Sequence, residues 1–250
     1  MNARYSGLDP KWTHYAEGVI SGKILAGKYI ILAAKRYLSW FDRTDIFFNE
    51  ELMNHIEDFI GHMRHFEGSF NKKPFVLLDF QRFVLASIFA WYYVDDPEKR
   101  VVEEVLLFIA RKNAKTALSA AIILADMCIG KEAGYEGYLA AQTREQAKIA
   151  YKFIKGYAKS LDPKKKHFKI YRDHVIYPKT SGIVKVLSAE AGVSDGLNPC
   201  LALLDEQHAS KDDDMYQVLK SGMGMRKNPL VIIISSGGYL MDGFPFYERV

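Results

Sequence analysis

Apolar residues recur at helical spacing through the first part of the chain. Between residues 13 and 40 they stand three or four positions apart, which places them on one face of a helix. A second helix is expected over residues 49–65. The polar stretch at residues 71–74 interrupts this pattern and contains Pro74, so we expect a boundary there. The pattern predicts an N-terminal helical region over residues 1–70.

From residue 71 onward, short apolar runs alternate with segments of helical periodicity. Strands are expected at 101–110, 138–141, 175–177, 183–187, 201–204 and 230–235. Helices are expected at 79–93, 115–129, 144–160 and 213–221. Residues 180–182 (Thr-Ser-Gly) are expected to turn a hairpin between two of the strands. Short buried strands alternating with helices predict an α/β domain over residues 71–250, with a mainly parallel sheet.

Composition narrows the class of protein only slightly. Hydrophobic residues make up 49% of the 250 positions, enough for a large core. The net charge of +4 is compatible with a polyanionic partner without requiring one. Cys128 and Cys200 lie inside apolar runs, which favours buried free thiols. The start of the chain has no signal-peptide pattern and no run of about 18 apolar residues exists, so we expect a soluble intracellular protein.

Residues 106–116 have the layout of a phosphate-binding loop. An apolar strand leads into a short basic loop, and Lys115-Thr116 opens the following helix. In such a loop, backbone N–H groups and a helix N-terminus face the phosphates, while Lys contacts them and the hydroxyl serves Mg²⁺. The match is incomplete, because Ile109 and Ala114 stand where the pattern has glycine. Alanine restricts positive φ, so we expect a permitted conformation at Ala114.

A second candidate feature is the pair Asp205-Glu206 after the apolar run 201–204. Ligands of open α/β sheets bind at the carboxyl ends of strands. There, Asp205 would hold Mg²⁺ through water, opposite Thr116, and Glu206 would orient or deprotonate the attacking water. A solvated acidic turn is the structural alternative for this pair taken alone. Together with Lys115 and Thr116, the pair favours an ATPase.

Three weaker features accompany these. Ser235, Ser236 and Gly237 follow an apolar strand, where hydroxyls would sense the γ-phosphate; a simple turn is the alternative. Gln81 lies one helix ahead of the loop strand, and its amide can both donate to and accept from an adenine edge. Thr143 and Gln146 are spaced as a helix capping box.

Taken in order, these stretches resemble the large subunit of tailed-phage terminase, the DNA-packaging motor. The stretches that carry the resemblance are residues 14–23, 79–82, 111–116, 143–147, 194–199 and 205–209. They are similar to the branch of the family whose phosphate loop reads Arg-Lys-Asn-small-Lys-Thr. Their joint order is specific, although each piece is not.

The resemblance implies a P-loop ATPase fold of the additional-strand, catalytic-glutamate type. It implies ATP and Mg²⁺ as ligands, and double-stranded DNA, the portal protein of the procapsid and the small terminase subunit as partners. It also implies a homo-oligomeric ring, expected to be a pentamer, that acts in the host cell cytoplasm, docks transiently at the portal vertex and is absent from the mature virion. No membrane partner is expected.

The resemblance also implies roles for individual residues. Gln81 would read adenine, and Glu206 would be the catalytic carboxylate. Thr116 and Asp205 would serve Mg²⁺, and Ser235, Ser236 and Gly237 would couple hydrolysis to motion. The phosphate-binding set comprises Arg111, Lys112, Asn113, Ala114, Lys115 and Thr116.

Two features depart from the family. Many members carry, before the acidic strand, an arginine that acts on the neighbouring subunit. Here Asp195-Gly196 occupies that place, so Arg226 is the predicted substitute, with a solvated surface arginine as the alternative. Family members usually continue into a nuclease domain with a carboxylate cluster. The chain stops 14 residues after Ser236, so we expect the motor half alone, without nuclease activity.

Two other functions remain open from the sequence. Gln81, residues 143–145 and residues 206–208 are similar to motifs of superfamily 2 helicases. A helicase of that kind would also need a second motor domain. A non-catalytic assembly module would bind nucleotide without turnover. For DNA contact, the densest basic run is Lys164, Lys165, Lys166, Lys169 and Arg172, although such a run is commonly a solvated loop.

Overall fold

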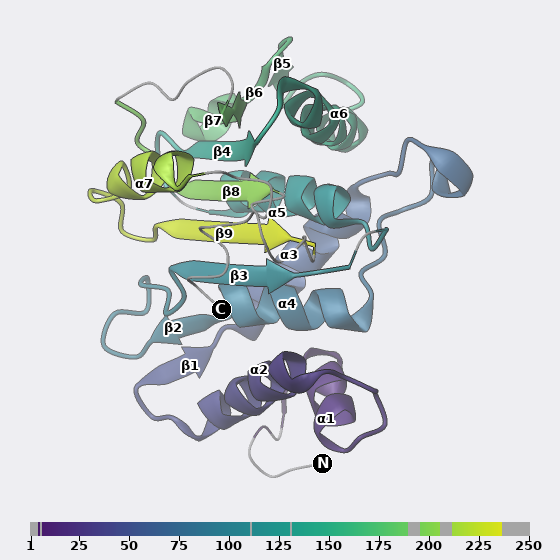
Figure 1. The fold of residues 1–250 in the computed structure, drawn as a ribbon, viewed down its shortest axis with the longest axis vertical. Coiled ribbons are helices and arrows are strands. Elements are labelled where there is room, and N and C mark those ends of the chain that lie inside the picture. The colour runs from purple at the N-terminus through teal and green to yellow at the C-terminus, as the bar shows by residue number, and fades with distance from the viewer. Residues whose placement is uncertain are drawn as a thin grey trace. The chain divides into compact units, whose positions relative to one another are not determined.

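The computed structural model describes residues 5, 7–110, 112–130, 132–189, 196–205 and 212–236. The chain forms two compact units (Figure 1). The first unit comprises residues 1–61 and 76–102, and the second comprises residues 62–75 and 103–250. The units interleave along the chain, whereas the sequence predicted one boundary after residue 70.

The first unit is mainly helical. Its elements are α1 (His14–Ile20), α2 (Lys28–Ser39), β1 (Ile46–Phe48), α3 (Glu50–His62), α4 (Asp79–Phe89) and β2 (Trp91–Tyr93). The single helix predicted over residues 13–40 is wrong: it is two helices, α1 and α2. Gly22 has φ +75°, which ends the first helix, and the Ile24 N–H turns back to the Gly18 carbonyl at 2.9 Å. The helix predicted over 79–93 also ends early, because residues 91–93 pair with β1 as an antiparallel strand.

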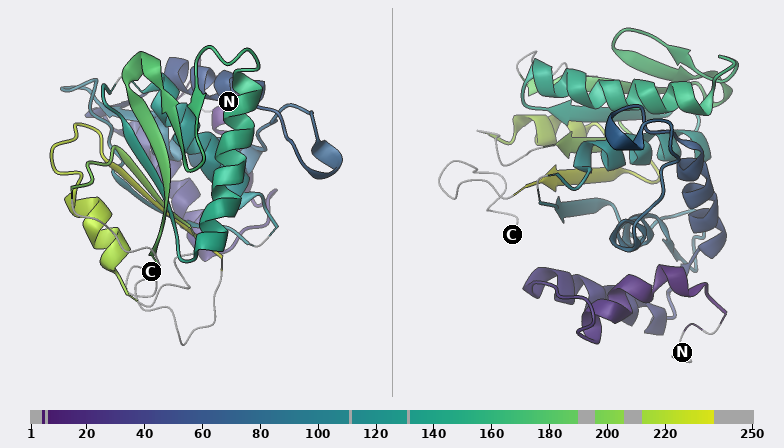
Figure 2. Two further views of the ribbon diagram at one scale, coloured as in Figure 1. Left: turned by 90° about the horizontal axis from the view of Figure 1, so that it is seen from above. Right: turned by 90° about the vertical axis from the view of Figure 1, so that its right-hand side faces the viewer.

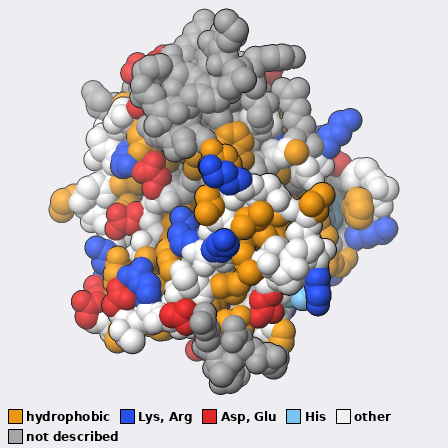
Figure 3. All heavy atoms as spheres, turned by 60° about the horizontal axis from the view of Figure 1, so that its bottom comes forward, with side chains coloured by type: hydrophobic (Ala, Val, Ile, Leu, Met, Phe, Trp, Pro, Cys, Tyr) orange, Lys and Arg blue, Asp and Glu red, His pale blue; other side chains and the backbone are white. Residues whose placement is uncertain are grey.

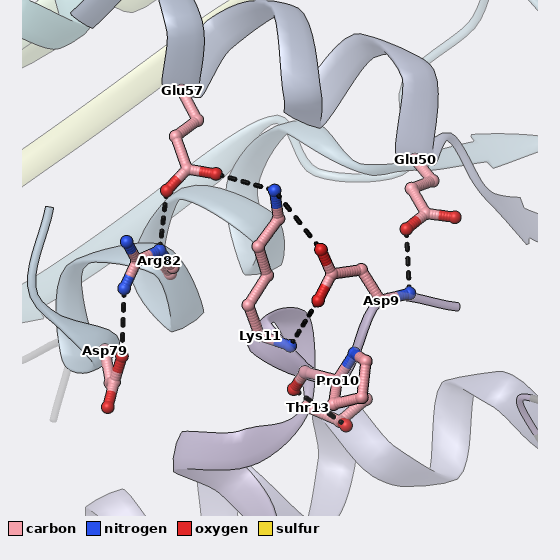
Figure 4. A network of polar contacts seen from close by, with 8 residues as sticks. All are labelled: Asp9, Pro10, Lys11, Thr13, Glu50, Glu57, Asp79 and Arg82. Atoms are coloured by element: carbon pink, nitrogen blue, oxygen red, sulfur yellow. Dashed lines mark hydrogen bonds and ion pairs between the residues drawn. The ribbon is translucent and has the colours of Figure 1, made fainter. Parts of the chain in front are cut away.

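A polar network ties the start of the chain to α3 and α4 (Figure 4). The Glu57 carboxylate accepts from Lys11 Nζ at 2.9 Å and from Arg82 Nε at 2.6 Å. Arg82 also donates to Asp79 at 2.9 Å. Burial alone would raise the pKa of Glu57, but the bonds from Lys11 and Arg82 outweigh it and hold the pKa below its usual value. Because a lowered pKa favours the folded state only while Glu57 is ionised, this contribution is present above about pH 4.5 and is lost as the pH falls further.

The first unit exposes several apolar side chains on and beside α2. They are Leu25, Tyr29, Ile30 and Leu32. Figure 3 shows a face of the molecule on which hydrophobic side chains lie among Lys and Arg side chains. Ile20, the last residue of α1, is 43% exposed. In the described part of the chain, no helix combines the length and apolar character required to cross a membrane.

The second unit is built on a seven-stranded sheet. Its elements are β3 (Glu104–Phe108), α5 (Lys115–Ile129), β4 (Glu136–Ala141), α6 (Arg144–Leu161), β5 (Lys169–Ile170), β6 (His174–Tyr177), β7 (Gly182–Ser188), β8 (Leu201–Asp205), α7 (Asp214–Ser221) and β9 (Leu230–Ser235). The strand order is β3-β9-β8-β4-β7-β6-β5. The first five are parallel, β6 is antiparallel to β7, and β5 is antiparallel to β6. The predicted α/β fold with a mainly parallel sheet is confirmed.

The strand order explains which strand ends lie close together. β9, the last strand of the described residues, lies between β3 and β8, so it is the additional strand between the phosphate loop and the acidic strand. The loop after β3, Asp205 at the end of β8 and Ser235 at the end of β9 therefore share one edge of the sheet. This arrangement is the additional-strand type that the resemblance implied.

Helices cover both faces of this sheet. Figure 2 shows α6 on one side of the sheet and α7 on the other. Alternate residues of β4, β8 and β9 pack against α7, as the period of two in strands requires. α5 is apolar on all sides, with eleven of its fifteen residues buried. The predicted capping box of α6 is confirmed, with Thr143 and Gln146 bonded reciprocally at 3.2 Å.

Both cysteines are free thiols, as the sequence predicted. Cys200 is buried where the chain enters β8, and Cys128 is partly buried near the end of α5. Burial raises the pKa of each thiol to about 12, because the thiolate would lose its hydration.

Candidate functional site

The candidate site lies at the carboxyl ends of β3, β9 and β8 in the second unit. The strand β3 ends at Phe108, and α5 begins at Lys115 as predicted. The Ile109 N–H donates to the Ser235 carbonyl at 3.0 Å, which continues the parallel pairing of β3 and β9 into the loop. The start of the loop is thereby held against the end of β9.

The backbone of the loop twice enters the left-handed region. Lys112 has φ +69°, and Ala114, the residue before α5, has φ +54° and ψ +31°. Glycine adopts this conformation without cost, whereas alanine reaches only its small allowed part. Ala114 therefore performs the turn that glycine performs in the usual pattern. The conformation lies in a permitted region, as expected, but a residue other than glycine adopts that region only with strain.

Replacing Ala114 tests this reading of the loop. Ala114→Val should destabilise the chain by about 1–3 kcal/mol, because a β-branched residue is a clear outlier at this φ. Ala114→Gly should be neutral or stabilising by up to about 1 kcal/mol, since relief of strain is offset by greater freedom of the unfolded chain. Urea denaturation of both variants measures the difference. Equal stability of the two would contradict a left-handed Ala114.

Lys115 is buried beneath the loop, with only 7% of its surface exposed. Its Nζ donates to the Ile109 carbonyl at 3.3 Å. The ammonium therefore lies within the loop rather than in solvent. Asn113 makes a second bond within the loop, donating from Nδ2 to the Ala110 carbonyl at 3.2 Å.

The structure brings Thr116 and Asp205 together across 89 residues of sequence. The Thr116 hydroxyl donates to Asp205 Oδ2 at 3.5 Å. A hydroxyl beside a single carboxylate fits Mg²⁺, which commonly takes one or two protein carboxylates and completes its shell with phosphate and water. Among the described residues no group of three or more His, Cys, Asp or Glu is placed to hold a metal ion. The donor set therefore fits a metal held jointly with a phosphate ligand.

The two serines at the end of β9 lie beside the loop. Ser235 and Ser236 are almost fully buried, and Ser235 pairs with Phe108 in the sheet register. The Ser235 hydroxyl donates to the Ser236 carbonyl at 3.1 Å. A displacement of the backbone at Ser235 would be transmitted directly to Ile109, because the Ser235 carbonyl accepts the Ile109 N–H.

Three predicted site residues, Arg111, Glu206 and Gly237, lie outside the described residues. Glu206 directly follows Asp205, the last residue of β8, and Arg111 directly precedes Lys112. Their roles stay predictions.

Gln81 belongs to the first unit and is 3% exposed. It lies in the first turn of α4, where its Oε1 accepts the Leu78 N–H at 2.9 Å. The amide oxygen therefore satisfies a backbone donor at the helix start. Adenine recognition by Gln81 stays a prediction, to which the amide NH₂ group would contribute donors.

Arg226 is held by groups of its own chain, and its side chain is only 9% exposed. Its guanidinium donates to the Asn198 and Gly134 carbonyls and to Glu132 Oε1, at 2.6–3.1 Å. These partners precede β8 and β4, so Arg226 lies at the amino ends of the strands, opposite the phosphate loop. The predicted action on a neighbouring subunit finds no support in this geometry. Arg226 ties three loops together.

A structural role for Arg226 has a measurable consequence. Arg226→Ala should lower the free energy of unfolding by about 2–3 kcal/mol, because it leaves carbonyls and a carboxylate without their donor. Arg226→Lys should not restore it, since one ammonium cannot reproduce the planar fork. Lys179→Ala, at an exposed position, is the control for thermal denaturation. Unchanged stability of Arg226→Ala with lost ATPase in an assembled ring would instead favour the trans-acting role.

The sequence offered no signal for the part that Ile109 plays. Its side chain was a departure from the glycine pattern, yet its backbone forms two loop contacts, to Ser235 and to Lys115. Backbone contacts of this kind leave no trace in the identity of a residue.

Comparison with known proteins agrees with this geometry. The family model "Terminase large subunit, ATPase domain" matches residues 79–246. The chain is 33% identical to the terminase large subunit of Enterobacteria phage HK97 over 177 residues, which cover 68% of the chain and 33% of that protein. It is 24% identical to the terminase large subunit of Lactococcus phage p2 over 185 residues, covering 70% of the chain and 33% of that protein.

A solved structure gives the same result. The crystal structure of the HK97 bacteriophage large terminase is similar to the chain with a TM-score of 0.60 and 30% identity, covering 73% of this chain and 37% of that one. The chain thus spans about a third of the length of these relatives. The matching family is the one that the sequence resemblance indicated, and a superfamily 2 helicase is not favoured. The chain belongs to the family of terminase large subunit ATPase domains.

Proposed function

We propose that this chain hydrolyses ATP with Mg²⁺ and that, in an assembled ring at a procapsid portal, this turnover drives double-stranded DNA into the capsid. The observation that carries the proposal is the Thr116–Asp205 contact of 3.5 Å beside the buried Lys115. A hydroxyl, a carboxylate and an ammonium at the end of a phosphate-loop strand are the parts that phosphoryl transfer requires. Family membership supports the same reaction.

Each residue of the site has a distinct task in this proposal. Lys115 donates to phosphate oxygens in place of the Ile109 carbonyl, and Thr116 and Asp205 hold Mg²⁺. When bound, Mg²⁺ neutralises charge that develops on the β- and γ-phosphates. Glu206 orients the attacking water and accepts its proton. The backbone N–H groups of residues 111–115 and the N-terminus of α5 bind the phosphates.

The remaining residues would bind the nucleotide or relay its state. Arg111 contacts phosphate, Gln81 contacts adenine, and Ser235, Ser236 and Gly237 respond to the γ-phosphate. Ser235 already holds Ile109 in the loop, so a change at one serine reaches the loop through one hydrogen bond. The family resemblance implies two protein partners, the portal protein and the small terminase subunit. It also implies assembly of the chain into a five-membered ring.

Release of inorganic phosphate from ATP by the purified chain tests the proposal. Turnover is expected with Mg²⁺ and should fall at least about 100-fold with excess EDTA, because the metal stabilises the charge of the transition state. Packaging of DNA with procapsids and portal tests the coupled function. Nucleotide binding without any turnover, alone or with procapsids and DNA, would instead identify a non-catalytic assembly module. ATP-dependent separation of a tailed duplex would indicate a helicase.

A further inference from the structure

Helix α6 carries an unusual concentration of positive charge. Its 18 residues hold five basic side chains, Arg144, Lys148, Lys152, Lys155 and Lys159, and one acidic side chain, Glu145. The resulting net charge of +4 equals that of the whole 250-residue chain. All other charges therefore cancel, and the excess positive charge of the protein corresponds to this one helix.

These five cations form a single stripe. Their spacings of four, four, three and four residues keep them within about 80° of arc on a helix of 3.6 residues per turn. The helix buries a different face, which includes Ala150, Ile154 and Ala158. Arg144, Lys148, Lys152 and Lys159 are exposed, and Lys155 is partly exposed. The stripe extends about 22 Å along the helix axis.

A short arm, residues 62–75, extends this basic surface. Its two sides pair as a hairpin, with the Phe75 N–H bonded to the Met63 carbonyl at 2.9 Å and the His65 N–H to the Lys73 carbonyl at 3.0 Å. Figure 2 shows the arm standing beside α6. It adds Arg64 and Lys72 to the cations of the stripe.

The arm is seated on α6 by specific contacts. The rings of Phe66 and Phe75 pack against Tyr157 at centroid distances of 5.9 and 5.8 Å. The Arg64 N–H donates to the Ser160 hydroxyl at 3.0 Å. Gly156 lets the Phe66 ring approach, since a Cβ there would come within 2.4 Å of that ring. A glycine inside a helix is less favourable than alanine, and this close approach accounts for its presence.

Between the arm and the stripe lies a hollow of about 470 Å³. Its basic lining comprises Arg64, Lys72, Lys152, Lys155 and Lys159. One carboxylate is close by, because Lys152 pairs with Glu67 of the arm. The hollow thus combines a regular row of cations with room for a bulky anionic group.

We infer that the α6 stripe and the arm bind the phosphate backbone of double-stranded DNA. This inference rests on the proposed function, since DNA is the polyanion that such a motor would move. Successive phosphates of one strand rise about 3.4 Å along the duplex axis, so a stripe of about 22 Å faces roughly six of them. A row of cations on a rigid helix reads charge and not base sequence, as a motor that moves any sequence requires.

The lysine run at residues 164–166 is a weaker candidate for the same contact. It lies in a tight turn around Asp162, whose carboxylate accepts the N–H groups of Lys166, His167 and Phe168 at 2.6–2.9 Å. Burial would raise the pKa of Asp162, but these backbone bonds outweigh it and lower the pKa. The negative charge of Asp162 lies in the same turn as these lysines and offsets part of their charge. The run carries three lysines, as many as the stripe variant removes, so it serves as a matched control.

The test measures binding of the full chain to a fluorescent 30-base-pair duplex at 50 to 200 mM salt, without nucleotide. The stripe variant carries Lys148→Gln, Lys155→Gln and Lys159→Gln, which remove three charges and keep helix propensity. Each phosphate contact contributes about 0.9 to the slope of log affinity against log salt, so the slope should flatten by about 2.7. Affinity at 50 mM should fall at least about tenfold.

Two further variants make the result decisive. Lys164→Gln with Lys165→Gln and Lys166→Gln removes the same charge and should leave slope and affinity within twofold of the parent chain. Lys148→Arg with Lys155→Arg and Lys159→Arg keeps the charge and should retain binding. Circular dichroism should show equal helix content in all chains; if the stripe variant alone loses helix, Lys155→Gln with Lys159→Gln replaces it, with an expected slope change of about 1.8.

Several outcomes would overturn the inference. These are equal binding by the stripe variant and the parent chain, no binding of the duplex by the parent chain, or tighter binding of poly-glutamate than of the duplex through the same lysines. Because the assay contains no nucleotide, each outcome is separate from the proposed function. Stripe-dependent DNA binding in a chain that never hydrolyses ATP would overturn only the proposed function.

Discussion

Lys115→Ala is expected to lower the turnover of ATP at least about 100-fold, the scale of removing a donor aimed at transition-state charge. Lys115 is the cation that the structure buries beneath the phosphate loop, with Nζ at 3.3 Å from the Ile109 carbonyl. No alanine atom can reach the phosphates from that position. Lys115→Arg should not rescue turnover, because a planar guanidinium does not replace a compact ammonium in a closed loop. Steady-state release of phosphate measures the effect.

Lys220→Ala is a matched control for this variant. Lys220 donates to the carboxylate of Glu104 at the amino end of β3, whereas the candidate site lies at the carboxyl ends of the strands. Its loss should therefore leave turnover near that of the parent chain. Thermal denaturation should show that Lys115→Ala still folds, since the substitution shortens a side chain and adds no bulk beneath the loop. A folded Lys115→Ala chain with more than about a tenth of normal turnover would contradict the assignment.

Glu206→Gln is expected to retain ATP binding while the turnover number falls at least about 100-fold. The amide keeps the size of the side chain but cannot accept a proton from water, so the loss should appear in kcat and leave KM little changed. The sequence position of Glu206, directly after the last residue of β8, brings it next to the Asp205 that Thr116 contacts. A fluorescent ATP analogue measures binding, and single-turnover hydrolysis measures the chemical step.

Glu104→Gln makes the same chemical change at the amino end of β3, away from the carboxyl ends where the candidate site lies. Glu104 accepts from Tyr216 at 2.9 Å and from Lys220, outside the candidate site. Its amide variant should turn over ATP at the normal rate. If Glu206→Gln also hydrolyses ATP as fast as the parent chain, the catalytic carboxylate lies elsewhere.

The sequence alone determined the parts of the chain in which local pattern and final environment agree. Helix α5 and strand β9 have the bounds that periodicity predicts, residues 115–129 and 230–235, because their apolar residues are buried on nearly all sides. The approach of Thr116 to Asp205 was also predicted, since the carboxyl ends of parallel strands share one edge. These inferences require only strand direction and order, which the motif spacing constrains.

Local pattern misled where distant groups compete for a residue. The periodic segment 13–40 broke into α1 and α2, because Gly22 takes a positive φ and the chain folds back on Gly18. The guanidinium of Arg226 is bonded to two other loops of its own chain, and its predicted trans-acting role stays a prediction without support in this geometry. The amide oxygen of Gln81 accepts the Leu78 N–H, while adenine contact by Gln81 stays a prediction. Each outcome depends on partners that a linear sequence does not identify.

The loop and α6 show the same division. The order of the motifs identified the phosphate loop, but only the backbone of the folded chain assigned the left-handed turn to Ala114 and the Lys115 contact to Ile109. The basic spacing of α6 is legible in the sequence, yet its hollow exists only because Gly156 admits Phe66 of an arm from about 90 residues earlier. Periodicity records what a residue prefers within its own element. Tertiary packing decides which atoms from distant elements meet, because that depends on the positions of all of them at once.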